Sequence, residues 1–172
     1  MIPYTTRLRS AGGGAESSPD AHWKQLTRIA NSAFADGDYG AARAHYLEAI
    51  HEAESLFEAA ANGSGWTDAA ALLMVAHANL AELLIQTGER VAGRNCCQSG
   101  LERLLAVVCD ADVNADTQAF RAECYRQLNP ALQEFLHYQS TLPARDRSRG
   151  ELVVARVRLA ATTFAREASQ CH

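Results

Sequence analysis

A glycine-centred turn between two amphipathic segments constrains the fold of this chain most strongly. Residues 26–49 read LTRIANSAFADGDYGAARAHYLEA, and apolar or small residues recur at three- and four-residue spacing on both sides of Gly37. Because glycine has no Cβ, it can end a helix and reverse the chain at little cost, and Asp38 can cap the helix that follows. The stretch therefore predicts two antiparallel helices joined by a short turn.

A weaker second copy of this pattern appears when Gly37 is aligned with Gly88, which lies 51 residues further along the chain. Small residues then recur in pairs where the two helices of each hairpin must touch. These pairs are Ala30 and Ala81 before the turn, Ala42 and Gly93 after it, and Ala49 and Gly100 further on. The chain is therefore expected to contain two related hairpins.

The order of small and large residues in residues 26–49 resembles the tetratricopeptide repeat (TPR), in which two antiparallel helices nest closely. The resemblance implies an all-α fold of antiparallel helix hairpins, stacked in a short TPR-like right-handed superhelix with a C-terminal capping helix. The usual repeat period is about 34 residues. The longer spacing here predicts longer helices and a true linker, placed at the Gly-containing segment 62–66.

Helical periodicity and breaking residues divide the chain into a flexible arm, residues 1–20, and one helical domain, residues 21–172. Thr67 and Asp68 are suited to cap the third helix, which has the densest apolar face and is expected to be the most buried. Residues 144–150 are predicted to form a polar loop. Helices are expected over residues 22–35, 39–60, 67–86, 89–108, 117–138 and 151–169.

Two of these helices leave alternatives open. Pro130 lies inside the fifth, so either that helix kinks or two helices meet at Asn129. The last helix has one apolar stripe and either caps the array, forms a dimer contact, or inserts into the groove as an internal ligand. The stripe consists of Val153, Val157, Ala160, Phe164 and Ala168.

Composition narrows the classes of function. The chain has 172 residues, a net charge of −4 and a pI of about 5.8, which argues against nucleic-acid and anionic-membrane partners. Its N-terminus lacks the apolar segment of a secretory signal, and no uninterrupted apolar run approaches the ~20 residues of a membrane span. Five cysteines are an odd number, which argues against a disulfide framework. We expect a cytoplasmic protein.

Sequence motifs for catalysis are absent: there is no Gly-rich phosphate loop and no HExxH, GxSxG or CxxC motif. The histidines and cysteines offer only loose metal-ligand combinations, such as His51 with Glu54 and Cys171 with His172. Cys97 and Cys124 occupy core-like positions. We therefore expect neither an enzyme nor a bound cofactor or metal.

The TPR resemblance also implies candidate binding residues, because the first helices of successive repeats line a concave groove. Some family members grip a partner's C-terminal carboxylate with two asparagines, and Asn31 and Asn79 occupy the matching positions. Amide donors suit a carboxylate, and a neighbouring cation strengthens the bond. The position of the family's lysine is Thr27 here. The nearby cations that can substitute for it are Lys24, Arg28, Arg121 and Arg126.

Three hypotheses about function follow. The first is a non-catalytic adaptor or scaffold that binds a peptide or protein in the groove. The second is a secretion-type chaperone, since small acidic TPR proteins of this size resemble the chaperones of type III translocator proteins, although those have short regular repeats. The third is a small-molecule or metal binder that uses His and Cys side chains. A homodimer through the last helix is a separate possibility, because the segment from Arg145 onward carries a charge of +3 on an otherwise acidic chain.

Overall fold

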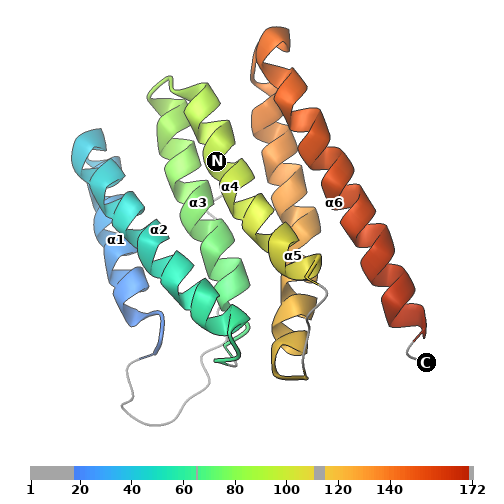
Figure 1. Ribbon diagram of the computed structural model, residues 1–172. Coiled ribbons are helices and arrows are strands. Elements are labelled where there is room, and N and C mark those ends of the chain that lie inside the picture. Colours follow the sequence, from blue (N-terminus) through green and yellow to red (C-terminus); the bar gives the residue numbers. More distant parts are fainter. Residues whose placement is uncertain (1–17, 65, 111–114, 171–172) are drawn as a thin grey trace.

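The computed structural model describes residues 18–64, 66–110 and 115–170, and within them the chain forms six α-helices and no β-strand (Figure 1). The predicted all-α class is confirmed, and the first four helices begin and end within two residues of the predicted bounds. The helices are α1 (Ala21–Ala35), α2 (Tyr39–Ala61), α3 (Ala69–Gln86), α4 (Arg90–Val108), α5 (Ala115–Ser140) and α6 (Ala144–Gln170).

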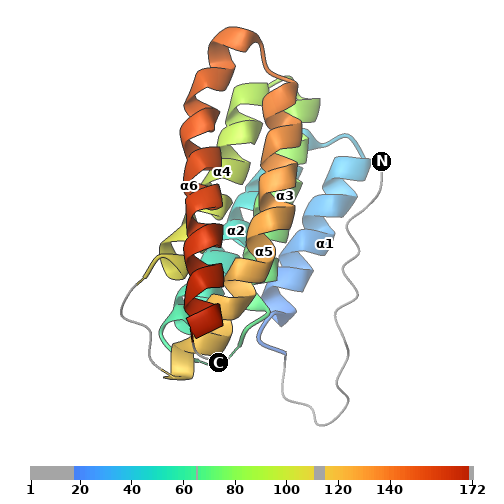
Figure 2. The same ribbon diagram turned by 90° about the vertical axis from the view of Figure 1, so that its right-hand side faces the viewer.

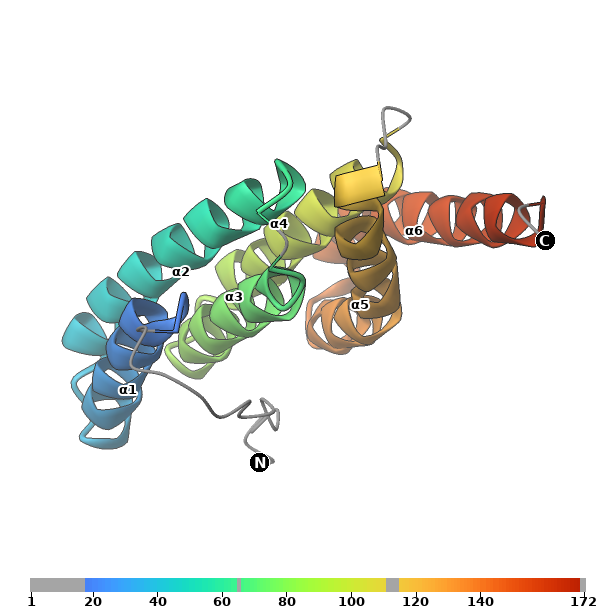
Figure 3. The same ribbon diagram turned by 90° about the horizontal axis from the view of Figure 1, so that it is seen from below.

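Consecutive helices run antiparallel and form two rows (Figure 3). α1, α3 and α5 make one row, and α2, α4 and α6 make the other. α3 packs against α2, α4 and α5, while α6 lies at the end of the array against α4 and α5 (Figure 2). The buried face of α6 includes Val153, Val157 and Ala160 and lies against the array, so α6 covers the array rather than entering a groove.

The two glycine turns have the same hydrogen bonds. Gly37 and Gly88 have φ values of 80° and 90°, and each donates its backbone N–H to the carbonyl three residues earlier. The next residue donates to the carbonyl five residues earlier, which completes a Schellman motif. The Asp38 carboxylate accepts a hydrogen bond from the Ala41 N–H at 3.0 Å, so the predicted cap of α2 is confirmed. Asp68 is the N-cap of α3, but its side chain makes no capping hydrogen bond.

The predicted contact positions are confirmed as places where helices approach closely. Ala30, Ala42, Ala49 and Ala81 are each 1% exposed or less. A Cβ on Gly93 would lie 2.8 Å from the carbonyl oxygen of Ala81, which leaves no room for a side chain between α3 and α4.

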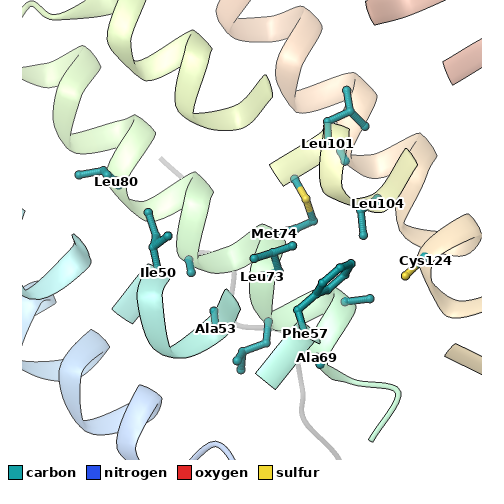
Figure 4. Packing of buried hydrophobic residues seen from close by; sticks show 14 of the residues in the cluster. Ile50, Ala53, Phe57, Ala69, Leu73, Met74, Leu80, Leu101, Leu104 and Cys124 are labelled. Atoms are coloured by element: carbon teal, nitrogen blue, oxygen red, sulfur yellow. The ribbon is translucent and has the colours of Figure 1, made fainter. Parts of the chain in front are cut away.

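The core is centred on α3, as the sequence predicts. Leu73 and Met74 belong to one buried cluster with residues of α2, such as Phe57, and residues of α4, such as Leu104 (Figure 4). By length and composition α3 could cross a membrane, and 61% of it is buried inside the array, which is typical of the core helix of a compact protein. The linker between α2 and α3 and the 23-residue length of α2 account for the long repeat spacing.

α5 runs through Pro130 without ending, so the alternative of two helices meeting at Asn129 is wrong. Proline has no N–H, and the helical hydrogen bond to the carbonyl of Arg126 is therefore lost. One continuous buried face before and after the proline holds the helix together. It consists of Phe120, Cys124, Leu128, Leu132 and Phe135.

The predicted polar loop over residues 144–150 is also wrong, because α6 already begins at Ala144. Pro143 is suited to the start of a helix, and Asp146 in the first turn is favoured by the helix dipole. The Arg147 side chain donates to the carbonyls of Leu142 and Ser140 at the end of α5. Gly150 resembles a helix stop in the sequence, but it is buried against Gln139 of α5, where a side chain would not fit.

Most of the predicted arm, residues 1–17, lies outside the described residues, as do Cys171, His172 and the side chain of Ala168. Residues 18–20 lead directly into α1. Asp20 is buried, and its carboxylate lies 2.9 Å from the Lys24 ammonium one helical turn later. The first helix, α1, begins after these residues at Ala21.

Candidate functional site

A groove runs between α3 and α5, the neighbouring first helices of two hairpins. It encloses a cavity of about 200 Å³. α3 contributes Ala71, Met74, Val75, Ala78 and Asn79, and α5 contributes Gln127, Pro130, Ala131 and Glu134. Its two walls, α3 and α5, are neighbours in the row formed by α1, α3 and α5 (Figure 3).

Helical periodicity explains how both walls form. Ala71, Val75 and Ala78 recur at spacings of four and three, which places them on one side of α3. Gln127, Ala131 and Glu134 do the same on α5. Since alanine side chains are short, they leave space between the two helices, whereas larger residues at the same positions would fill it.

Glu134 gives the groove its charge. Among the described residues that line the groove, it is the only one with an ionisable side chain. Burial raises the pKa of its carboxyl group, and the nearby Glu82 raises it further, while the hydrogen bond from Tyr138 and the proximity of His137 oppose this shift. The Tyr138 hydroxyl lies 3.3 Å from the Glu134 carboxylate.

The groove combines three kinds of surface. Met74, Val75 and Pro130 supply apolar contacts, and the side-chain amides of Asn79 and Gln127 can each donate and accept hydrogen bonds. The carboxylate of Glu134 can accept charge-assisted hydrogen bonds from a cation. This arrangement is suited to a peptide segment that presents an apolar side chain beside a lysine or arginine.

A family model described as "Protein of unknown function (DUF2753)" matches residues 21–163. The chain belongs to this family. The match begins at the first residue of α1 and extends into α6, so it includes both walls of the groove. No curated protein and no solved structure matches this DUF2753 chain at a significant level.

Of the six binding residues predicted from sequence, the structure places Asn79 in the groove. Asn31 lies on α1, where its amide oxygen accepts a hydrogen bond from the Tyr46 hydroxyl of α2 at 2.6 Å. Lys24 is paired with Asp20 within α1. Arg28 is exposed on the same helix. Lys24, Arg28 and Asn31 follow one another at spacings of four and three on α1, and none of them lines the groove of the DUF2753 chain that contains Asn79.

The two predicted arginines of α5 have other contacts. Arg121 donates two hydrogen bonds to the carbonyl of Val108, at 2.8 and 3.0 Å, and its guanidinium lies 5.0 Å from the ring centre of Phe164. Arg126 is exposed and pairs with Glu123 on its own helix. None of the predicted cations is among the described residues that line the groove, where the charged residue is Glu134.

The sequence interpretation missed Gln127 and Glu134 as groove residues. Their spacing on the predicted fifth helix, beside the core positions, was the one signal that could have found them. That spacing shows which residues share a face, but it does not show that α3 lies opposite.

His77 and Cys96 form the one close His–Cys pair among the described contacts, with 3.4 Å between Nδ1 and Sγ. Burial, aided by the positive charge of Arg103, lowers the pKa of His77 to about 4. Burial, with the nearby Glu54, raises the pKa of Cys96 to about 12. Both side chains are therefore neutral near pH 7, so the thiol is a poor nucleophile there.

Within the described residues, no three His, Cys, Asp or Glu side chains lie close enough together to hold a metal ion. Of the predicted combinations, His51 is exposed on α2, and Glu54 forms an ion pair with Arg103 at 3.1 Å. Cys171 and His172 lie outside the described part of the chain.

Proposed function

We propose that this DUF2753 protein is a non-catalytic interaction module, and that it binds a basic peptide segment of a partner protein in the groove between α3 and α5. The observation that carries the proposal is the composition of that groove. Apolar side chains, two side-chain amides and one half-buried carboxylate line a single concave surface.

We also propose that the three helix hairpins are TPR-like and wind into a short right-handed superhelix. Support comes from the matching Schellman turns at Gly37 and Gly88 and from the small residues at matching contact positions. The hairpin of α5 and α6 supplies a third unit. Under this proposal α3 and α5 are equivalent first helices, and the groove between them is the surface on which such arrays bind peptides.

The charge of Glu134 favours a basic ligand over a C-terminal carboxylate. A peptide carboxylate beside Asn79 would face the Glu134 carboxylate, and like charges repel strongly where water is partly excluded. A lysine or arginine would instead form a charge-assisted hydrogen bond, which contributes roughly 1.5–3 kcal/mol. Glu82, an exposed carboxylate close enough to raise the Glu134 pKa, adds to the attraction.

Peptide display with the full-length protein as bait tests this proposal. We expect the enriched peptides to contain lysine or arginine beside apolar residues. Glu134→Gln keeps the shape of the side chain but removes its charge, and it should weaken binding of these peptides about tenfold or more, which corresponds to ~1.4 kcal/mol or more.

Ala78→Arg should abolish binding, because its long side chain would fill the groove and repel a basic ligand. Ala44→Arg is the matched control, since Ala44 is exposed on α2, away from the groove, and this variant should bind the peptides like the wild type. Enriched peptides that are acidic, or that bind Ala78→Arg as tightly as the wild type, would rule out the groove as the binding site.

A further inference from the structure

α6 has an apolar face that no other described helix covers. Leu152 and Leu159 are 69% and 68% exposed, more than any other large hydrophobic side chain of the described residues. Both lie on a helix whose Val153 and Val157 are buried against the array, so these leucines belong to a second face.

The second face is a regular stripe. Leu152, Arg156, Leu159, Thr163 and Arg166 follow one another at spacings of four, three, four and three residues, which keeps them on one side of the helix. We call these five residues the α6 stripe. All five side chains of the α6 stripe are exposed.

A cleft between α4 and α6 continues this apolar surface. The cleft has a volume of about 280 Å³, and Arg156, Leu159 and Thr163 of the α6 stripe line it. Leu105 and Val108 of α4 and Phe164 of α6 form its apolar walls. A side chain that contacted the stripe could therefore enter a preformed cleft beside it.

The positive charge at the cleft comes from α5 and α6. Arg121 and Arg156 line the cleft with the carboxylate of Asp110, and the Glu102 carboxylate of α4 lies near Arg156. The sequence from Arg145 onward has six arginines against three acidic residues. Arg156 lies 4.0 Å from the Glu102 carboxylate of α4, so its guanidinium already reaches across the cleft to a carboxylate.

This charge distribution discriminates between possible occupants. Arg156 lies about midway between Leu152 and Leu159 on α6. If the α6 helices of two copies packed antiparallel through these leucines, each Arg156 would face Arg156 of the other copy. A parallel pair would also place each arginine beside its equivalent. Like charges at close range are unfavourable, whereas a helix with acidic residues beside its apolar side chains would complement the stripe.

We infer that the α6 stripe is a second binding surface, and that it binds an acidic amphipathic helix of a partner protein. An apolar side chain of that helix enters the cleft between α4 and α6. Its Asp or Glu residues pair with Arg156 and Arg166.

A fluorescein-labelled helical peptide with leucines at seven-residue spacing, flanked by glutamates, tests this inference by fluorescence anisotropy with the full-length protein. We expect saturable binding that weakens at least tenfold in Leu159→Ser. Arg156→Glu should weaken binding of this peptide and favour an otherwise identical peptide with lysines in place of glutamates. Leu47→Ser is the matched control, since Leu47 is a 51% exposed leucine on α2, and this variant should bind like the wild type.

Several results would overturn the inference. These are no saturable binding of the glutamate peptide, equal binding of the lysine peptide by the wild type, or unchanged affinity in Leu159→Ser. A wild-type dimer in light scattering that becomes monomeric in Leu159→Ser would show instead that the stripe joins two copies. Binding to phosphatidylserine vesicles that Arg156→Glu abolishes would point to a membrane. Ala78→Arg blocks the proposed groove but leaves this surface intact, so the two proposals can fail separately.

Discussion

Gly93→Ala tests how closely α3 and α4 approach. In most helix interiors this substitution stabilises a protein by up to ~1 kcal/mol, because alanine has the higher helix propensity. Here the new Cβ would lie 2.8 Å from the Ala81 carbonyl oxygen and 2.8 Å from Cγ1 of Ile85. Carbon atoms in favourable contact are roughly 3.5–4.0 Å apart, so α3 and α4 would have to separate.

The expected loss of stability follows from these two opposing effects. Overpacking a core costs ~1–3 kcal/mol, and the cost here should be near the upper end because one obstacle is a backbone carbonyl. After subtraction of the propensity gain, the free energy of unfolding should fall by about 2 kcal/mol. For a chain of this length, that lowers Tm by roughly 4–8 °C.

Urea unfolding followed by far-UV circular dichroism measures this loss. Gly40→Ala is the matched control, because the nearest atom to a new Cβ there is the Asp38 carboxylate oxygen at an ordinary 3.5 Å. That variant should be as stable as the wild type or slightly more stable. If Gly93→Ala matched the wild type, the close approach of α3 and α4 would be refuted.

Three further predictions concern capping, pH and thiol reactivity. Asp38→Ala removes the cap of α2 and should lower the free energy of unfolding by about 1 kcal/mol in the same assay. The pKa of His77 is about 4 in the folded state against 6.5 in the unfolded state, so the unfolded state binds more protons between these values. As the pH falls from 6.5 to 4, the free energy of unfolding of the wild type should therefore fall by about 3 kcal/mol relative to that of His77→Gln. A difference between the two proteins that did not change with pH would contradict this. In Cys171→Ser, a thiol reagent should react rapidly with exposed Cys109 only, because Cys97 and Cys124 are buried, Cys96 is partly buried, and burial raises the pKa values of all three. Several fast-reacting thiols would contradict this burial.

The parts of the fold that depend on local chemistry were predictable. A positive φ at Gly37 and Gly88 and a carboxylate at Asp38 act within a few residues of the chain, so the sequence pattern revealed both hairpin turns. The start of α6 was not predictable in this way. A glycine such as Gly150 often ends a helix, but here it is needed for a tertiary contact, because only a residue without a side chain can lie this close to Gln139.

The third hairpin was missed for a related reason. α5 and α6 are joined at residues 141–143 without a glycine, and the buried side chain of Leu142 holds this turn instead. An alignment based on glycine turns therefore found two units only.

The candidate groove was predictable only in part. The resemblance to TPR proteins drew attention to Asn79, but its neighbours Gln127 and Glu134 are on a helix about fifty residues later. Packing of α3 against α5 brings the three side chains together, and that packing depends on the whole core. The Glu134 carboxylate in the groove, on which the proposed preference for a basic ligand rests, therefore appeared only in the structure.

Nuclear magnetic resonance tests directly whether the groove between α3 and α5 binds a basic peptide. ¹⁵N-labelled full-length protein is titrated with a peptide enriched in the display experiment. We expect the shifted amide signals to cluster on residues 71–79 and 127–134, and we expect Glu134→Gln to reduce these shifts at equal peptide concentration. Shifts that cluster on other helices, with residues 71–79 and 127–134 unchanged, would contradict it.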